Sequence, residues 1–75
     1  MKYKEGDRVR CITPVFEKIF AGCNVWIIDY IKTQVNKPSL YVAYRENDKR
    51  KVLYQFFENE LVKETRSLEE INNNN

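Results

Sequence analysis

The chain has 75 residues and a formal net charge of +2, which indicates one small domain near the lower limit of what a single core can stabilise unaided. Its apolar runs are far shorter than the roughly 18 residues that a membrane-spanning helix needs, so we expect no transmembrane segment. Two cysteines allow at most one disulfide, and the charged segment 1–10 lacks the apolar stretch of a signal peptide. We therefore expect a cytoplasmic protein in a reducing compartment.

The first strand is predicted over residues 8–12, after the turn pair Gly6-Asp7. Polar and apolar residues alternate there, as a half-buried strand requires. Pro14 is expected to end the strand because proline has no N–H to donate to a ladder. Residues 15–23 are predicted to form a loop whose apolar side chains, Phe16, Ile19 and Phe20, fold back over an open end of the sheet.

Three apolar runs follow with short polar connections, and they predict strands at residues 25–31, 40–45 and 51–57. Residues 33–39 are expected to be a polar loop, and residues 46–49 a tight hairpin. The strands are apolar on both faces, so the sheet must curl on itself to keep that surface from water. Asp29 stands out in the second strand, either buried against an arginine or, more commonly for such a residue, facing solvent near a strand end.

The C-terminal part is predicted to hold a single 3₁₀ turn at residues 58–60 and a short fifth strand at 61–63. Apolar content falls after Thr65, and we expect residues 66–75 to be a disordered acidic, Asn-rich tail following a domain at 1–65. Residues 1–57 carry a net charge of +5 and residues 58–75 a net charge of −3. This asymmetry favours a basic face on the domain beside an acidic tail.

The segment Gly6-Asp7-Arg8-Val9-Arg10 resembles the Gly-Asp-x-Val opening of KOW domains and of many small bacterial and phage barrels. Residues 57–62 resemble their closing segment, in which an acidic turn precedes a Leu-Val strand. The resemblance covers about residues 5–64. It implies an all-β fold, a small five-stranded SH3-like barrel with a 3₁₀ turn before the last strand, and a bacterial or phage origin. The chain departs from the KOW pattern at one place. KOW sequences usually have a second glycine shortly before strand two, whereas here Gly22 is followed by Cys23-Asn24-Val25.

Enzyme chemistry is not expected. The chain has no histidine, so a nucleophilic Cys11 or Cys23 would lack its usual base. Two cysteines separated by eleven residues also fall short of the four ligands of a structural zinc site. We expect no cofactor and no bound metal.

Two binding hypotheses remain. Ten aromatic residues exceed what so small a core encloses easily, and an exposed aromatic patch would suit a protein partner or a homodimer. The candidate protein-binding residues are Trp26, Tyr30, Tyr41, Tyr44 and Tyr54. A converging set of cations would instead bind the phosphates of nucleic acid, with Arg8, Arg10, Arg45, Lys49, Arg50 and Lys51 as candidates. We favour a non-catalytic module that binds protein, with weak KOW-like nucleic-acid binding as the alternative.

Overall fold

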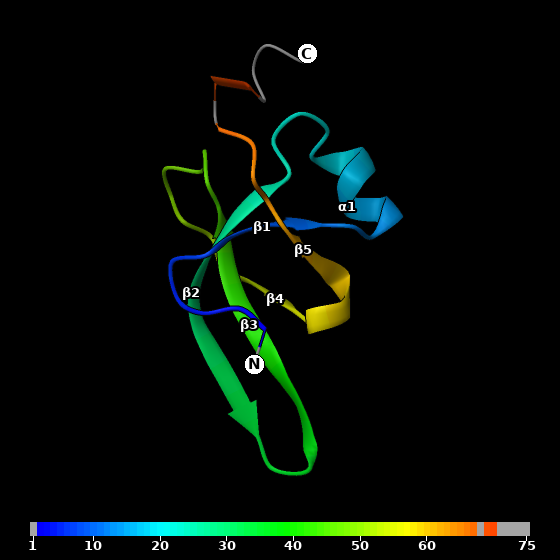
Figure 1. Ribbon diagram of the computed structural model, residues 1–75, viewed down its shortest axis with the longest axis vertical. Coiled ribbons are helices and arrows are strands. Elements are labelled where there is room, and N and C mark those ends of the chain that lie inside the picture. The colour runs from blue at the N-terminus through cyan, green and yellow to red at the C-terminus, as the bar shows by residue number, and fades with distance from the viewer. Residues whose placement is uncertain (1, 68, 71–75) are drawn as a thin grey trace.

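The computed structural model describes residues 2–67, 69 and 70 (Figure 1). Within them the chain forms five strands, one short α-helix and one 3₁₀ turn. In chain order these are β1 (Arg8–Cys11), α1 (Pro14–Ile19), β2 (Val25–Gln34), β3 (Lys37–Arg45), β4 (Tyr54–Phe56), η1 (Glu58–Glu60) and β5 (Leu61–Lys63). The all-β class is confirmed, and so are the 3₁₀ turn and the short last strand at their predicted positions.

The strands form one antiparallel sheet in the order β4-β3-β2-β1-β5. Three of the four pairings join strands that are neighbours in the chain, while the fourth joins β1 to β5. In that pairing Val9 lies opposite Lys63 and Cys11 opposite Leu61. The first and last strands are therefore side by side, and residues near both ends of the domain share one surface.

The core lies on one face of this sheet. Alternate residues of β1, β2 and β3 point into it, as the two-residue repeat of a strand requires. The buried cluster consists of Tyr3, Val9, Cys11, Trp26, Ile28, Tyr41, Ala43, Phe56 and Leu61. Asn24 is buried beside it, accepting a hydrogen bond from the Trp26 indole (2.7 Å) and donating one to the Cys11 carbonyl (2.6 Å).

The predicted loop at residues 15–23 is corrected by α1. Pro14 occupies the first turn of the helix, where its missing N–H costs nothing and its fixed φ favours helical geometry. Phe16 and Phe20, four residues apart, pack on the core as expected, and both rings lie within 6 Å of the Trp26 ring. Ile19 does not join them, because its side chain is 64% exposed on the other side of the helix.

The predicted polar loop at residues 33–39 is also corrected, because β2 and β3 run on through most of it. They form a projecting two-stranded arm that turns at residues 35–36, as the lower part of Figure 1 shows. Asn36 takes a φ of 58° at this turn, a conformation that asparagine tolerates better than most residues. Both faces of such an arm meet solvent, so polar residues suit its strands.

A register shift between Ile28 and Tyr30 changes which residues of β2 face the core. Trp26 and Ile28 point inward, but after the shift Ile31 packs against the core and Tyr30 lies outside. Asp29, at the shift itself, is exposed, which agrees with the interpretation that it faces solvent and not with burial against an arginine. A β-bulge of this kind re-aims the side chains that follow it.

The predicted tight hairpin at 46–49 and strand at 51–57 give way to a longer connection, leaving β4 with only Tyr54–Phe56. The Asp48 carboxylate organises this connection by accepting hydrogen bonds from the backbone N–H groups of Arg50 (3.0 Å) and Val52 (3.1 Å). These two bonds lower the pKa of Asp48 below its ordinary value. Of the predicted tail, residues 68 and 71–75 lie outside the described residues.

Candidate functional site

The outer face of the sheet, opposite the core, carries two of the predicted protein-binding tyrosines. Ile27 lies directly across from Tyr44, and Tyr30 directly across from Val42. Tyr30 is 42% exposed, and Tyr44 and Ile27 are half-buried. We call Ile27, Tyr30 and Tyr44 the outer aromatic patch. The β-bulge creates it, because without the register shift Tyr30 would face the core.

Trp26 and Tyr41 are corrected as surface candidates, since they are 0% and 1% exposed. Trp26 is enclosed by the rings of Phe16 in α1, of Phe20 just after it, and of Tyr54 and Phe56 in β4. The Tyr41 hydroxyl donates to the Glu58 carboxylate (2.9 Å) and accepts from the Tyr3 backbone N–H (3.3 Å). Burial raises the pKa of Tyr41, and the bond to Glu58 adds to that shift. These two side chains build the fold rather than a binding surface.

Tyr54 lies at the rim of the core. Its register partner is Ala43, a core residue, and its ring centroid is 5.1 Å from that of Trp26 and 5.9 Å from that of Phe16. The ring is nevertheless partly exposed. It therefore belongs to the edge of the sheet near α1 and not to the outer aromatic patch.

Several further large apolar side chains are exposed among the described residues and were not singled out from the sequence as surface candidates. They are Ile12, Val15, Ile19, Val35, Val52, Leu53 and Phe57. Val15 and Ile19 are four residues apart on α1, so they share one side of the helix. A helical interpretation of residues 14–19 would have identified this pair.

The six predicted nucleic-acid-binding cations occupy three places. Arg8 and Arg10 lie on β1, Arg45 lies at the end of β3 against Phe20, and Lys49, Arg50 and Lys51 form an exposed run in the β3–β4 connection. The Arg45 guanidinium is 4.6 Å from the centre of the Phe20 ring and donates to Asn47 (3.2 Å) and Cys23 (3.5 Å). Lys51 places its ammonium 5.1 Å from the centre of the Tyr44 ring, which brings one cation to the outer aromatic patch.

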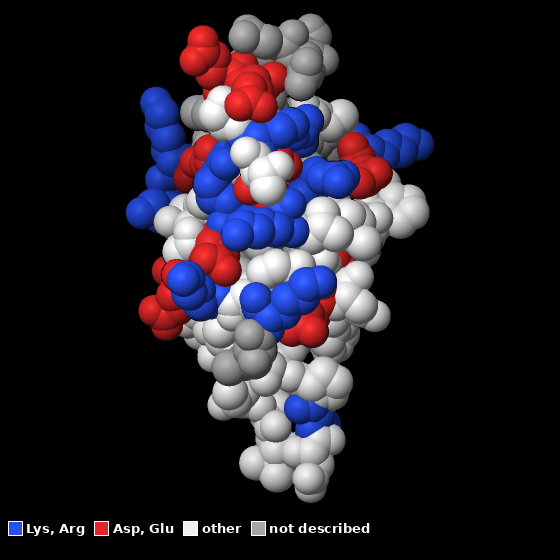
Figure 2. Space-filling view, viewed as in Figure 1, with Lys and Arg blue, Asp and Glu red and all other residues white. Residues whose placement is uncertain are grey.

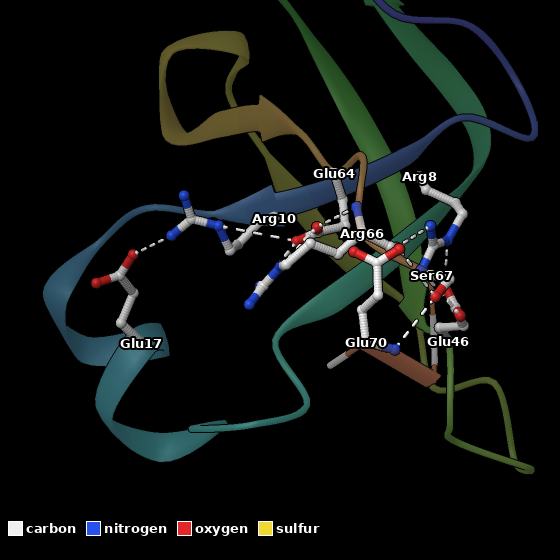
Figure 3. Close-up of polar contacts among 8 residues, drawn as sticks. All are labelled: Arg8, Arg10, Glu17, Glu46, Glu64, Arg66, Ser67 and Glu70. Carbon is white, nitrogen blue, oxygen red and sulfur yellow. Dashed lines mark hydrogen bonds and ion pairs between the residues drawn. The ribbon is translucent and has the colours of Figure 1, made fainter. Parts of the chain in front are cut away.

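Arg8 is held in a two-point ion pair by Glu46, which follows β3. Its Nε and Nη2 donate to the two carboxylate oxygens at 2.6 and 3.2 Å (Figure 3). The hydrogen bond to Glu46 is the main reason why the pKa of Arg8 is raised. Nη1 of the same side chain donates to the backbone carbonyl of Arg66 at 2.5 Å. Arg8 thereby fixes the segment that follows β5 against β1.

Glu64 follows β5 and has an almost fully buried carboxylate, 3% exposed. Arg66 donates to it from Nε (3.0 Å), from Nη2 (3.1 Å) and from its backbone N–H (2.9 Å). Arg10 approaches the same carboxylate at 3.9 Å and pairs with Glu17 of α1 at 2.7 Å. The hydrogen bonds from Arg66 lower the pKa of Glu64 despite its burial. Figure 3 shows the Arg66 guanidinium against this carboxylate, and Arg10 with its Nε toward Glu64 and its Nη1 turned to Glu17.

An open hollow of about 440 Å³ lies over this cluster, and we call it the Glu64 hollow. It is lined by Arg10, Lys63, Glu64, Thr65 and Arg66. Figure 2 shows lysine and arginine side chains gathered over β1 and β5, with carboxylates among them, while the projecting arm carries little charge on this face. Lys63 and Arg66 were not predicted as site residues. The β1–β5 pairing brings Arg66 beside Arg10, whereas Lys63 pairs with Val9 and its side chain leaves the sheet on the face opposite to Arg10.

Both cysteines are free thiols, Cys11 in the core and Cys23 half-buried. Residues 2–67, 69 and 70 contain no group of three or more His, Cys, Asp or Glu side chains placed to hold a metal ion. In the same part of the chain no helix has the length and apolarity needed to cross a membrane. Comparisons of this chain with family models, curated proteins and solved structures gave no match.

Proposed function

We propose that this protein is a cytoplasmic SH3-like barrel without catalytic activity, acting as a module that binds a protein partner through an aromatic and basic surface. The strand order supports the barrel, because the first strand, β1, pairs with β2 on one side and with the last strand, β5, on the other. Only residues 57–60 connect β4 at one edge to β5 at the other. A flat sheet of five strands would be about 19 Å across, whereas a 3₁₀ turn advances only about 2 Å per residue. Strong curvature relieves that mismatch. The two free thiols suit a reducing compartment.

The observation that carries the binding function is the outer aromatic patch with Lys51 beside it. Tyr30 and Tyr44 combine a flat apolar ring with a hydroxyl, the kind of side chain that contributes most at protein interfaces. The position of the Lys51 ammonium over the Tyr44 ring adds a positive charge to the same surface. A patch of this composition also suits self-association, so a homodimer is included in the proposal.

The test replaces Tyr30 with alanine and compares it with Thr33→Ala, an exposed position on the same strand. Both variants should keep the wild-type circular dichroism and thermal unfolding, because neither side chain belongs to the core. Partners captured from the native host should bind Tyr30→Ala about tenfold more weakly and Thr33→Ala unchanged. Sedimentation equilibrium of the same samples measures self-association. Equal binding of both variants to every partner, itself included, would argue against the patch.

Nucleic-acid binding is the second candidate, and the run Lys49, Arg50 and Lys51 favours it. These side chains are exposed, and none of them forms an ion pair with another described residue. Binding through them should weaken steeply as salt increases, because neutralised phosphates release counterions. Reversal of the three charges to glutamate should abolish it. An affinity for single-stranded DNA that hardly changes between low and moderate salt would exclude this candidate.

A further inference from the structure

We infer that the protein partner presents an acidic segment to the outer aromatic patch, with one apolar side chain placed between two carboxylates. The apolar side chain would lie over the patch, and the carboxylates would contact Lys32 at one end and Lys51 at the other. The inference rests on the proposed function, because it names the chemistry of the partner that this surface binds.

The patch has a continuous apolar floor along β3. The core-facing residues of this part of the strand are Tyr41 and Ala43. The alternate residues Leu40, Val42 and Tyr44 therefore lie on the outer face. Val42 is only 2% exposed although it does not belong to the core cluster, so neighbouring side chains on the outer face cover it. A partner's apolar side chain would meet apolar surface all along this part of β3.

A cation lies at each end of this floor. Lys32 is directly across from Leu40, so its exposed side chain leaves the sheet on the same outer face. Lys51 places its ammonium 5.1 Å from the centre of the Tyr44 ring, at the other end. The step from Leu40 to Tyr44 along an extended strand is about 13 Å. The two cations therefore flank the apolar floor at a defined spacing.

The positive charge at the two ends is not neutralised within the described part of the chain. Neither Lys32 nor Lys51 forms an ion pair there. Glu46 follows β3, but Arg8 holds both of its carboxylate oxygens, at 2.6 and 3.2 Å. The two residues that precede Lys51 are exposed cations as well. This end of the patch therefore attracts a negative partner.

Two further carboxylates restrict where such a partner lies. Asp48 is turned to the backbone N–H groups of Arg50 and Val52. Asp29 is exposed at the bulge of β2 and repels other carboxylates from that strand. An acidic segment is therefore favoured over β3, from where its carboxylates reach Lys32 and Lys51.

An extended segment of the pattern acid-x-apolar-x-acid fits these positions. Alternate side chains of a strand point the same way, so two carboxylates four residues apart are about 13 Å apart, with the apolar side chain between them. This spacing matches the distance between the two ends of the floor. Nucleic acid also carries negative charge, but it has no apolar side chain between its phosphates.

The experiment titrates the full chain with four probes and follows the backbone amide signals by NMR. Three are peptides with blocked ends: Glu-Gly-Leu-Gly-Glu, its analogue Gln-Gly-Leu-Gly-Gln, and the rearranged Glu-Glu-Leu-Gly-Gly. The fourth is a thymidine trinucleotide, whose two phosphodiesters match the charge of the acidic peptides. The variants are Lys32→Gln and Lys51→Gln. Lys18→Gln is the matched control, because it removes the same charge from an exposed position of α1, the helix on the core face.

The peptide Glu-Gly-Leu-Gly-Glu should shift the amide signals of Tyr30, Val42 and Tyr44. Each of Lys32→Gln and Lys51→Gln should weaken its binding about threefold, as expected for the loss of one exposed ion pair. Lys18→Gln should bind as the wild type does. The glutamine analogue loses both ion pairs and should bind about tenfold more weakly, and the rearranged peptide about threefold.

Equal binding of the acidic peptide and its glutamine analogue would overturn the inference, and so would equal weakening by Lys18→Gln. Tighter binding of the trinucleotide than of the acidic peptide would overturn it in favour of nucleic acid. The lysine variants are also compared with Tyr30→Ala against partners captured from the native host. Weaker binding of those partners to Tyr30→Ala alone would leave the proposed function in place and reject the acidic partner.

Discussion

Asn24 joins two buried groups that would otherwise lack partners. Its side-chain amide accepts a hydrogen bond from the Trp26 indole N–H and donates one to the Cys11 carbonyl, which links the start of β2 to the end of β1. Asn24→Ala leaves both groups without a partner inside the protein, and a buried polar group without a partner costs about 1–3 kcal/mol. Urea unfolding should show a loss of that size.

Asn59→Ala is the control for this prediction, because Asn59 is exposed in the middle of η1. We expect its free energy of unfolding to stay within about 0.5 kcal/mol of the wild-type value. Similar losses for the two asparagines would contradict the structural role assigned to Asn24.

Glu64 makes stability depend on pH. Its pKa in the folded protein is lowered, chiefly by the hydrogen bonds from Arg66, so the folded state binds the proton less readily than the unfolded chain. This contribution is fully present above the unfolded glutamate pKa of about 4.3, and it is lost as pH falls from there through the folded pKa. Glu64→Gln should therefore cost about 1–2 kcal/mol at pH 7 and much less in strong acid.

Unfolding measured from neutral to acidic pH tests this directly. The difference between the wild type and Glu64→Gln should shrink as pH falls below about 4, because the unfolded chain binds a proton on this carboxylate there before the folded protein does. Glu5→Gln, at an exposed position in the turn before β1, should lie close to the wild type throughout. A difference for Glu64→Gln that stays constant across the range would mean that its carboxylate charge contributes nothing.

At the scale of elements, α1 contributes through one of its sides. Phe16 touches the rings of Trp26, Tyr54 and Phe56, whereas Ile19 on the same helix is largely exposed. Phe16→Ala should cost about 2–4 kcal/mol, somewhat below the loss for a fully buried phenylalanine, because Phe16 is only half-buried. Ile19→Ala should change stability by less than about 0.5 kcal/mol.

Chemical denaturation of the two variants measures this difference. A large loss for both would indicate that Ile19 is also packed, and a negligible loss for Phe16→Ala would mean that α1 does not cover the core. Either result would contradict the packing of this helix.

The apolar runs predicted the places of the strands because burial acts on side chains that alternate between two faces. The apolar runs did not predict the arm, because residues 33–39 are mostly polar. The strands of the arm are stabilised by the backbone hydrogen bonds between them and not by burial. Nor did the apolar runs predict α1, whose six residues are too few to show a helical period and whose Pro14 suited a strand end equally well. The β-bulge at Asp29 leaves no mark in hydropathy, although it decides that Tyr30 faces outward.

The site residues could likewise be predicted only in part from the sequence. The composition predicted that some aromatic rings must be exposed, but it could not separate Tyr30 from Trp26, because that depends on the register of β2 and on what packs above it. Arg10 was singled out from β1. The place of Arg66 could be predicted only with the knowledge that β5 pairs with β1, a contact across more than fifty residues. Long-range pairing of this kind is the part of a β-fold that a single sequence states least clearly.

For the whole molecule, β1 is the strand that connects the two ends of the domain. It pairs with both β2 and β5, carries Val9 and Cys11 into the core, and holds Arg10 at the Glu64 hollow. The basic first part and the acidic last part of the sequence meet at this strand. Basic residues from the first part of the chain meet Glu64 and Arg66 from the last part along this one strand (Figure 3).

The pairing of β1 with β5 is tested most directly by NMR. Backbone cross-relaxation should be observed between Cys11 and Leu61 and between Val9 and Lys63, together with the contact of Val9 and Trp26 on the other side of β1. A fully assigned spectrum in which β1 shows contacts to β2 but none to residues 61–63 would contradict the fold. The Glu64 hollow would then lose the arrangement that brings its cations together.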